Sequence, residues 1–537
     1  MFPARARLLT GCAVSALGLF FLGCSGHVSS DDPGALKLKA ENGGPKLGVD
    51  DWSQVPVPPA EGPKLAPVAM AVPVRAKPAP DAEVVGVLRV GARVARSVAP
   101  VTSRDCAGGW YAIRPFGFVC VGADVTLKLD HPVARAIQSE PDRSKPMPYK
   151  YAFLRAIAPN YMRVPTTEEQ LRYEMRLERH LRNWKKFREQ WDVLEIGAND
   201  VPLDANGQAL GPAPERARPM DQSERFGGNG SDEVPAWLLG ERRIPNLSSF
   251  KVPGYAVISN RIKRHSGVAL IGSFVAPESS QSRRFAITTD ARLIPADKLK
   301  PDSGSAFHGA DLKKLGLPVG FARSRDARWY RQQNGRFEEG EKLGFRELAA
   351  LSGNVRMSGS TRWVEARDGR WLQSDELGIV AKPSTLPAWV KKNTKWIDIS
   401  LVNQTLTLWE GDLPVYATLV STGRDGMGEP GKTLSTPQGI FRIFQKHVTT
   451  TMDSDVADHE FELRDVPWVM YFKGGYALHA AYWHDDFGRP RSHGCVNLAP
   501  IDARYVFLWS SPSVPEHWQA AYAGDATEPG TTINIHP

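Results

Sequence analysis

One cysteine of the chain lies among residue types that could make its thiol a nucleophile. Residues 492–497 have the sequence Ser-His-Gly-Cys-Val-Asn, and a second histidine, His479, precedes them. A cysteine attacks as its thiolate, and the imidazole of His479 or His493 can accept the proton. Gly494 lets the backbone turn tightly, so that successive N–H groups can converge on the oxygen of a tetrahedral intermediate. These residues predict acyl transfer at Cys495.

The first residues of the chain are typical of a bacterial export signal. Arg5 and Arg7 precede an apolar run over residues 8–23, which is too short to favour a membrane span. Cys24 follows Phe-Leu-Gly, which resembles the lipobox of lipoproteins, in which the cysteine becomes the lipidated first residue. We therefore expect a periplasmic, cell-envelope protein anchored to a membrane by lipid on Cys24. Ordinary cleavage and an uncleaved anchor are the alternatives.

The cysteine count points to one disulfide. Cys12 lies inside the signal and Cys24 at its end, which leaves Cys106, Cys120 and Cys495. In an oxidising compartment an odd number implies one pair and one free thiol. Cys106 and Cys120 are close in sequence, and adjacent strands could bring them within bonding distance. We expect these two to be bonded and Cys495 to be free.

Composition restricts the partners only loosely. The formal net charge of +8 is modest for 537 residues. It fits an anionic cell-wall polymer, and it fits equally well a mildly basic surface with no specific partner. No Lys/Arg run lies among aromatic residues in the manner of a nucleic-acid-binding segment, so we expect no nucleic-acid partner. The length allows about three or four domains.

The pattern along the chain predicts a mainly β, multidomain protein with some α-helix. Residues 1–24 form the signal and lipobox, and the Pro/Gly-rich residues 25–67 predict a disordered tether. Residues 68–128 alternate short strand-like runs with turns, which indicates a small barrel. Their Gly-Trp-Tyr at 109–111 and Gly-Phe-Val-Cys at 117–120 resemble bacterial SH3-like cell-wall targeting modules.

The middle of the chain carries no catalytic pattern. Residues 129–316 are expected to be a helical and mixed linker region, with a helix over 166–191 that begins in a capping box of Thr166 and Glu169. Strand-like runs at 361–365, 369–372 and 378–380 indicate a second SH3-like domain over 317–390. Alternating strands then begin again near residue 395, and a late helix is expected to start near Pro500.

Residues 394–537 resemble the L,D-transpeptidase catalytic domains of the YkuD-like family. The features that carry the resemblance occur in this order: Gln-Thr-Leu at 404–406, Ser-Thr-Gly at 421–423, Thr-Pro-Gln-Gly at 436–439, His479, and the motif at 492–497. The resemblance implies a mostly β, sandwich-like fold with the cysteine beside a cleft. It also implies peptidoglycan stem peptides as substrates, and neither a metal nor an organic cofactor. Ala480 and Asn497 depart from many members, which have Gly and Arg there.

Chemistry and the resemblance together give each residue a role. Cys495 would attack the carbonyl between the third stem residue and the terminal D-alanine, leaving a thioester. His479 is the expected base, with its other ring nitrogen held by a backbone carbonyl such as that of Ala480. The N–H groups of Gly494 and Cys495 would bind the oxyanion, and His493 would either assist the thiol or brace the loop.

Four further residues are candidates for substrate binding, and each has a structural alternative. Tyr471 and Tyr476 could line the donor cleft or pack in the core. Ser492 could touch substrate or bond its own backbone. Asn497 could orient substrate or serve in the loop.

The expected function is peptidoglycan L,D-transpeptidation with 3→3 crosslinks, and several alternatives remain open. A water acceptor would make an L,D-carboxypeptidase, and a protein lysine would make a protein-to-peptidoglycan ligase. A non-catalytic wall-binding lipoprotein, with an inert cysteine, is the alternative from another class. A metal site could be suggested by six residues that are near one another in sequence, but no zinc-type spacing supports one, and we predict none. These residues are His459, His479, His484, Asp485, Asp486 and His493.

Overall fold

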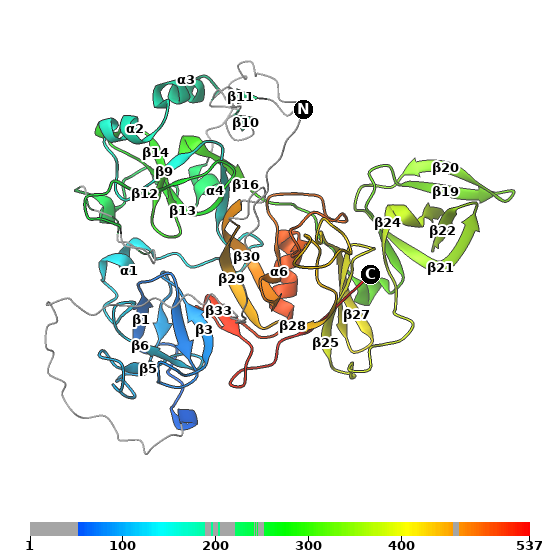
Figure 1. Cartoon of the computed structure of the whole chain (residues 1–537), viewed down its shortest axis with the longest axis horizontal. Helices are drawn as coiled ribbons and strands as arrows, with labels where there is room; N and C mark the ends of the chain where they lie inside the picture. The colour runs from blue at the N-terminus through cyan, green and yellow to red at the C-terminus, as the bar shows by residue number, and fades with distance from the viewer. Residues whose placement is uncertain are drawn as a thin grey trace, which may run out of the picture. The chain divides into compact units, whose positions relative to one another are not determined.

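The computed structural model describes residues 52–187, 195–196, 202–203, 221–240, 242, 244, 247, 252–454 and 461–537. The chain is mainly β over these ranges, as the sequence predicts (Figure 1). The expected signal, with Cys12 and the lipidation site Cys24, lies outside the described residues. Within the described ranges, no helix combines the length and the apolar character that crossing a membrane requires.

The first module contains short strands and one short helix. Its elements are η1 (Trp52–Gln54), β1 (Lys64–Pro67), β2 (Val72–Arg75), β3 (Val84–Leu88), β4 (Val94–Ala95), β5 (Trp110–Ala112), β6 (Phe118–Cys120), β7 (Val125–Thr126) and α1 (Pro132–Ala136). The predicted tether over 25–67 extends too far, because β1 pairs with β4 and β7 and buries Leu65 completely. The predicted disulfide is confirmed, with Cys106 and Cys120 joined by an S–S bond of 2.04 Å.

Residues 129–316, for which the sequence predicts a helical and mixed linker region, fold as a β-rich module that also contains helices. The strands are β8 (Lys150–Leu154), β9 (Ala158–Tyr161), β10 (Glu195–Ile196), β11 (Pro202–Leu203), β12 (Ile258–Ile262), β13 (Gly267–Val275), β14 (Arg284–Thr288), β15 (Leu293–Pro295) and β16 (Leu299–Asp302). The helices are α2 (Thr167–Tyr173), α3 (Leu177–Phe187) and α4 (Gln222–Phe226), with 3₁₀ turns at Ala236–Leu238, Glu278–Ser280 and Ala296–Lys298. Apolar side chains such as Val268 and Leu270 form a buried core there.

The single helix predicted over 166–191 is divided into α2 and α3. The capping box is present, with the Thr166 hydroxyl accepting from Glu169 N–H and the Glu169 carboxylate accepting from Thr166 N–H. The helix ends before Glu174, whose buried carboxylate forms an ion pair with Arg283 at 2.8 Å. Residues 188–191 of the predicted helix lie outside the described residues.

Residues 317–390, the predicted second SH3-like domain, form a seven-stranded sheet and are called the second module below. Its elements are β18 (Val319–Ala322), β19 (Arg328–Gln333), β20 (Arg336–Lys342), β21 (Leu348–Ser358), β22 (Thr361–Ala366), β23 (Trp371–Gln373), a 3₁₀ turn at Ser374–Glu376 and β24 (Leu377–Val380). The strand order is β20-β19-β23-β22-β21-β18-β24. None of the sheets in the described ranges closes into a barrel, so the SH3-like nature of residues 68–128 and 317–390 stays a prediction.

The C-terminal region packs strands around one large apolar core. Its strands are β25 (Lys395–Ser400), β26 (Thr405–Glu410), β27 (Leu413–Leu419), β28 (Gly439–Arg442), β29 (Gln445–Ser454), β30 (Phe461–Lys473), β31 (Tyr476–Ala480), β32 (Val496–Leu498), β33 (Ala520–Tyr522) and β34 (Thr532–His536). One sheet has the order β17-β27-β26-β25-β34-β28, in which β17 is Ala310–Asp311, followed by α5 (Leu312–Leu315). The second sheet contains β29 to β32. The predicted late helix is α6 (Pro500–Trp509), which packs on β30 and β31 and buries Val506 and Phe507 (Figure 1).

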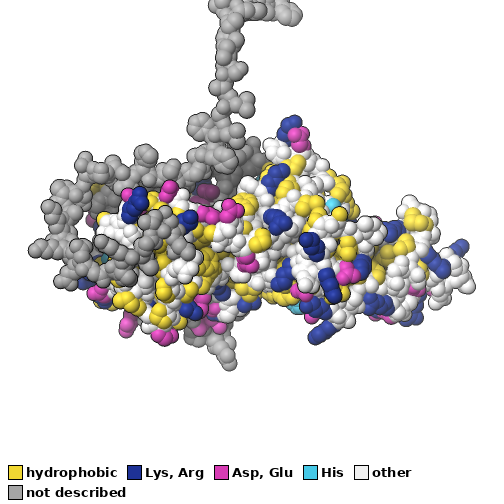
Figure 2. Space-filling model, turned by 90° about the horizontal axis from the view of Figure 1, so that it is seen from below, with side chains coloured by type: hydrophobic (Ala, Val, Ile, Leu, Met, Phe, Trp, Pro, Cys, Tyr) yellow, Lys and Arg dark blue, Asp and Glu magenta, His cyan; other side chains and the backbone are white. Residues whose placement is uncertain are grey.

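Charges of both signs are mixed on the face of the molecule in Figure 2. Lys and Arg side chains are spread over that face, with Asp and Glu side chains between them. The modest positive charge of the chain therefore does not form one continuous basic patch on this face.

A buried carboxylate, Asp465 in β30, joins three parts of the chain. It forms an ion pair with Arg89, which follows β3, and accepts hydrogen bonds from Thr289 Oγ1 at 2.5 Å and Thr449 Oγ1 at 2.8 Å. The side chains of Arg89 and Asp465 are 8% and 5% exposed, so neither charge can be solvated if its partner is removed. In addition, Tyr151 Oη donates to the Asp465 carbonyl at 2.8 Å.

We expect Asp465→Ala to destabilise the protein by about 3–5 kcal/mol, because it leaves the Arg89 guanidinium buried without a counter-charge. Chemical denaturation measures the loss as a lower midpoint. Asp368→Ala is the matched control, since its carboxylate pairs with Arg370 at the surface with 50% of the side chain exposed; it should cost under about 1 kcal/mol. Equal effects for the two variants would contradict a special role for Asp465.

Candidate active site

Two short parallel strands bring the predicted nucleophile and base together. β31 and β32 pair with Leu478 opposite Val496 and His479 opposite Asn497. Side chains alternate between the two faces of a strand, and Leu478 and Val496 lie in the core. His479 and Cys495 therefore lie on the other face. The ring centre of Trp483 is 5.6 Å from that of His479, and Trp483 packs on the same apolar cluster as Cys495.

His479 has the tautomer that a general base needs. Its side chain is buried, and Nδ1 lies 3.2 Å from the carbonyl oxygen of Ala480. Since a carbonyl only accepts, Nδ1 carries the proton and Nε2 carries the lone pair. This is the arrangement that the sequence predicts. Burial lowers the pKa of His479 to about 4, so the ring is neutral near pH 7.

Cys495 is the free cysteine of the described residues and is half-buried. Its Sγ lies 3.8 Å from the carbonyl oxygen of Gly475, and Tyr471 packs on the same apolar cluster. Burial raises the pKa of the Cys495 thiol to about 11. Together with the lowered pKa of His479, this shift makes the neutral thiol and neutral imidazole the resting state. An ion pair of thiolate and imidazolium is therefore not favoured before substrate binds.

Gly494 is required by its conformation and by the space around it. Its φ is +116°, a region that side-chain-bearing residues rarely adopt, and an added Cβ would lie 2.6 Å from Cε1 of Tyr476. Its N–H donates to Ser492 Oγ at 3.1 Å, and the Ser492 hydroxyl donates to the Cys495 carbonyl. Ser492 thus braces the loop, which is the structural alternative foreseen for it. The Gly494 N–H is engaged in this state, and Cys495 N–H remains a predicted oxyanion donor.

The motifs that lie far apart in the sequence are joined by buried hydrogen bonds. Gln404 donates through Nε2 to Thr422 Oγ1 at 2.6 Å and accepts the Thr422 N–H at 2.9 Å. Thr436 Oγ1 accepts the Gly423 N–H and donates to the Gly494 carbonyl, both at 2.8 Å. The ordered motifs of the sequence are therefore the supports of the loop that carries Cys495. The positions of Gln404 and Thr436 in the sequence do not reveal that they support this loop.

Asn497 pairs with His484, which the sequence suggests only as a possible metal ligand. Its carboxamide end lies 2.9 Å from Nε2 of His484. His484 Nδ1 accepts the Asp486 N–H at 3.2 Å, and burial lowers the pKa of His484 to about 4, so Nε2 carries the proton. The carboxamide oxygen of Asn497 is the group that can accept it. The other end of the Asn497 carboxamide is buried and has no hydrogen-bond partner among the described residues.

The other predicted residues have different surroundings. His493 is exposed. Tyr471 lies beside Cys495 and makes an edge contact with His447, with ring centres 5.7 Å apart. Tyr476 packs against the core, over Gly494. Tyr471 is therefore better placed than Tyr476 to line a donor cleft. Tyr476 packs against the core, which is the structural role considered for it as an alternative to substrate binding.

The residues considered for a metal are engaged elsewhere. Asp485 forms an ion pair with Arg346, and Asp486 forms one with Arg491. His459 lies outside the described residues. Among the residues that are described, no group of three or more His, Cys, Asp or Glu side chains could hold a metal ion.

The fold and the site define a class of protein, a β-rich domain with a free thiol and a neutral imidazole on one face of two parallel strands. Residues 394–535 match the model of the family YkuD, L,D-transpeptidase catalytic domain. This region of the chain is thus similar to the YkuD L,D-transpeptidase catalytic domain.

Individual relatives resemble part of the chain at low identity. A Bacillus subtilis (strain 168) protein named "Putative L,D-transpeptidase YciB" is 25% identical over 154 residues, which cover 24% of this chain and 65% of the relative. The crystal structure of the L,D-transpeptidase of Xylanimonas cellulosilytica is 22% identical, covering 28% of this chain and 65% of that chain, with a TM-score of 0.19. The catalytic domain of the E. faecium L,D-transpeptidase is 20% identical, covering 27% of this chain and 98% of that chain, with a TM-score of 0.20.

We expect Gly494→Ala to slow acylation of Cys495 by roughly 100-fold or more, because the new methyl group displaces the loop. Gly475→Ala is the matched control. Gly475 also lies beside Cys495, but an added Cβ meets nothing within 4 Å, so acylation should change little. Stopped-flow mass spectrometry with a carbapenem measures both rates. A Gly494→Ala protein that is folded and acylates at the wild-type rate would contradict this account.

The pKa shifts predict an unusual pH profile. His479 with a pKa of about 4 is already an unprotonated base at pH 6, and Cys495 with a pKa of about 11 remains a thiol at pH 9. The value of kcat/KM for acylation should therefore be nearly constant between about pH 6 and about pH 9. A site that needed an ordinary thiolate would instead gain about tenfold per pH unit up to about pH 8, and that slope would refute the neutral-pair state.

Proposed function

We propose that the chain is a peptidoglycan L,D-transpeptidase that forms 3→3 crosslinks through a thioacyl-enzyme on Cys495. The observation that carries the proposal is the placement of His479. Its Nδ1 is held by the Ala480 carbonyl, its Nε2 is free to accept a proton, and it shares a strand face with the free thiol. The YkuD family match over residues 394–535 supports stem peptides as the substrates.

The first half-reaction begins from the neutral pair. Sγ of Cys495 attacks the carbonyl between the third stem residue and the terminal D-alanine as its proton moves to Nε2 of His479. The Cys495 N–H would bind the oxyanion, with the Gly494 N–H joining it only if Ser492 releases that group. The imidazolium then gives its proton to the departing amine. D-alanine leaves, and the donor stem remains as a thioester on Cys495.

The second half-reaction repeats these proton movements with a new nucleophile. The amine of the third residue of another stem attacks the thioester, and His479 Nε2 takes the proton that the amine loses. The thiolate leaves and regains a proton from His479, so the free enzyme and one 3→3 crosslink result.

The same acyl-enzyme could have other acceptors. With water the enzyme would be an L,D-carboxypeptidase, and with a protein lysine it would be a protein-to-peptidoglycan ligase. The half-buried position of Cys495 among Tyr471, Trp483 and other apolar side chains limits water at the thioester and favours an amine acceptor. A non-catalytic wall-binding lipoprotein would have no need of the His479 tautomer.

The location of the protein is part of the proposal. We propose an exported protein in the periplasm, held to a membrane by lipid on Cys24 and to the wall polymer by its upstream modules. The disulfide between Cys106 and Cys120 supports an oxidising compartment.

We expect the purified protein, incubated with a disaccharide-tetrapeptide, to carry an adduct on Cys495 equal in mass to the donor without its terminal D-alanine. A carbapenem should give a comparable adduct, because the family resemblance implies a cleft that accepts it as a donor mimic. Cys495→Ser should lose turnover, since a hydroxyl is far less ionised than a thiol. Intact-mass spectra follow the adducts.

His479→Ala should slow acylation strongly and leave binding to purified wall sacculi unchanged. Crosslinked dimer should exceed hydrolysis product when a second stem is present. The absence of any adduct on Cys495 with both ligands would refute the transpeptidase proposal. An adduct that only hydrolyses would change the assignment to L,D-carboxypeptidase.

A further inference from the structure

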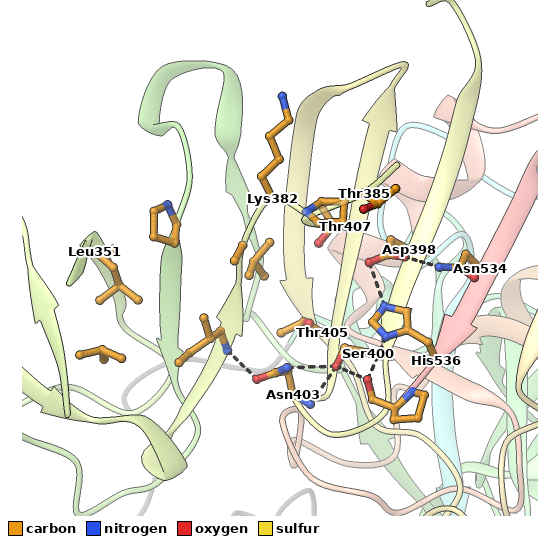
Figure 3. Close-up of a pocket in the computed structure, with 18 of the residues that line it drawn as sticks. Leu351, Lys382, Thr385, Asp398, Ser400, Asn403, Thr405, Thr407, Asn534 and His536 are labelled. Atoms are coloured by element: carbon orange, nitrogen blue, oxygen red, sulfur yellow. Dashed lines mark hydrogen bonds and ion pairs between the residues drawn. The ribbon is translucent and has the colours of Figure 1, made fainter. Parts of the chain in front are cut away.

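A cavity lies between the second module and the C-terminal region, away from Cys495. Its volume is about 650 Å³. Strands β25, β26 and β34 form its floor, and β21, β22 and β24 form the facing wall (Figure 3). The inward-facing residues of the floor strands, such as Ile397, Leu406 and Ile535, lie in the apolar core that also contains Val496. The cavity and Cys495 therefore lie on opposite outer faces of the two sheets that enclose this core.

The floor of the cavity is polar although it is covered. On β25 and β26, Asp398, Thr405 and Thr407 alternate with the core residues, and both threonines are only 3% exposed. Asp398 accepts a hydrogen bond from Asn534 Nδ2 at 2.8 Å and lies 3.1 Å from His536 Nε2 (Figure 3). Three neighbouring strands thus present hydroxyl, carboxylate, amide and imidazole groups in one plane.

The facing wall has the opposite character. Leu351, Val355, Val364 and Ile379 line it with aliphatic side chains. Two cations, Arg362 and Lys382, lie among the lining residues, and Lys382 forms a surface ion pair with Asp412 at 3.0 Å. A molecule in the cavity would meet an apolar surface on one side and many hydrogen-bonding groups on the other.

The cavity is not simply a poor fit between two modules. Close by, the same two parts are sealed by an apolar cluster in which Val319, Phe321 and Val380 meet Ala417 and Leu419. The backbone of β24 is also tied down, because Ile379 N–H donates to Asn403 Oδ1 at 3.2 Å. A packing interface would continue these apolar contacts. The floor instead keeps hydroxyl, carboxylate and amide groups, which suit a polar occupant better than an apolar one.

We propose that this cavity binds a pyranose oligosaccharide, and that its occupant is a strand of N-acetylated amino sugars. A pyranose ring has an apolar face of C–H groups and an edge of hydroxyl groups, which match the aliphatic wall and the polar floor. An acetamido group adds a methyl group for the wall and an amide for Asp398 or Asn534. The choice of amino sugars rests on the proposed function, because peptidoglycan strands consist of them.

The position of the cavity gives it a separate task. Since it lies across the core from Cys495, a glycan bound there cannot also carry its own scissile peptide within contact of the thiol. The cavity would hold the enzyme on one part of the wall while the thiol reacts with a stem from another part.

The test uses the full chain with Cys495→Ala, titrated with a linear tetramer of N-acetylglucosamine in a calorimeter. We expect saturable binding, weakened about five- to tenfold by Thr407→Val, which removes one hydroxyl without changing side-chain volume. Ala381→Trp, at the exposed rim of the cavity, should abolish binding without disturbing the core. Arg331→Ala is the matched control, because it removes an exposed charge of the same module outside the cavity, and binding should be unchanged.

Three outcomes would overturn the proposal. They are no binding of the tetramer, binding that Thr407→Val and Ala381→Trp leave unchanged, and binding at this cavity of a sugar-free tetrapeptide in its place. The wild-type protein is tested in parallel for the carbapenem adduct on Cys495. An adduct without glycan binding refutes the cavity proposal alone, and glycan binding without an adduct refutes the proposed function alone.

Discussion

The chemistry of this protein depends on the parallel pairing of two short strands, β31 and β32. Their register places His479 opposite Asn497 and sets Cys495 on the same face. A shift of one residue would turn the thiol into the core, because side chains alternate along a strand. The register is held from both sides, by Leu478 and Val496 in the core and by the loop bonds of Thr436 and Ser492. The nucleophile is therefore fixed by packing before any substrate arrives.

Burial of the pair has a chemical consequence. Desolvation disfavours both the thiolate and the imidazolium, so the site rests in its uncharged form. In the proposed reaction, charge would develop only as the thiol attacks, when the oxyanion and the imidazolium would form together. Their mutual attraction is stronger in a water-poor site than in bulk water. A thiolate that is always present would be open to oxidation. In the proposed reaction the thiolate would exist only while the reaction takes place.

The parts that sequence could predict are those encoded by local pattern or by residue type. The capping box at Thr166, the helix after Pro500, the disulfide of Cys106 with Cys120, and the His479 contact with Ala480 all follow from neighbours in the chain or from known chemistry. The ion pair between Glu174, at the end of α2, and Arg283 could not be predicted, because the two residues are over 100 positions apart. The same holds for Asp465 with Arg89 and for Asn497 with His484. Polar side chains reveal their partners only when the sheets are assembled.

The two outer faces of the C-terminal region carry different chemistry for a physical reason. The face of β31 and β32 is covered by apolar side chains such as Trp483 and Tyr471, which keep water from a reacting thiol. The face of β25, β26 and β34 keeps Thr, Asp and Asn under a covering module. One face thus suits a step in which charge must be concentrated, and the other suits the retention of a hydroxyl-rich polymer. Because the core between them is rigid and close-packed, holding the polymer need not disturb the geometry at Cys495.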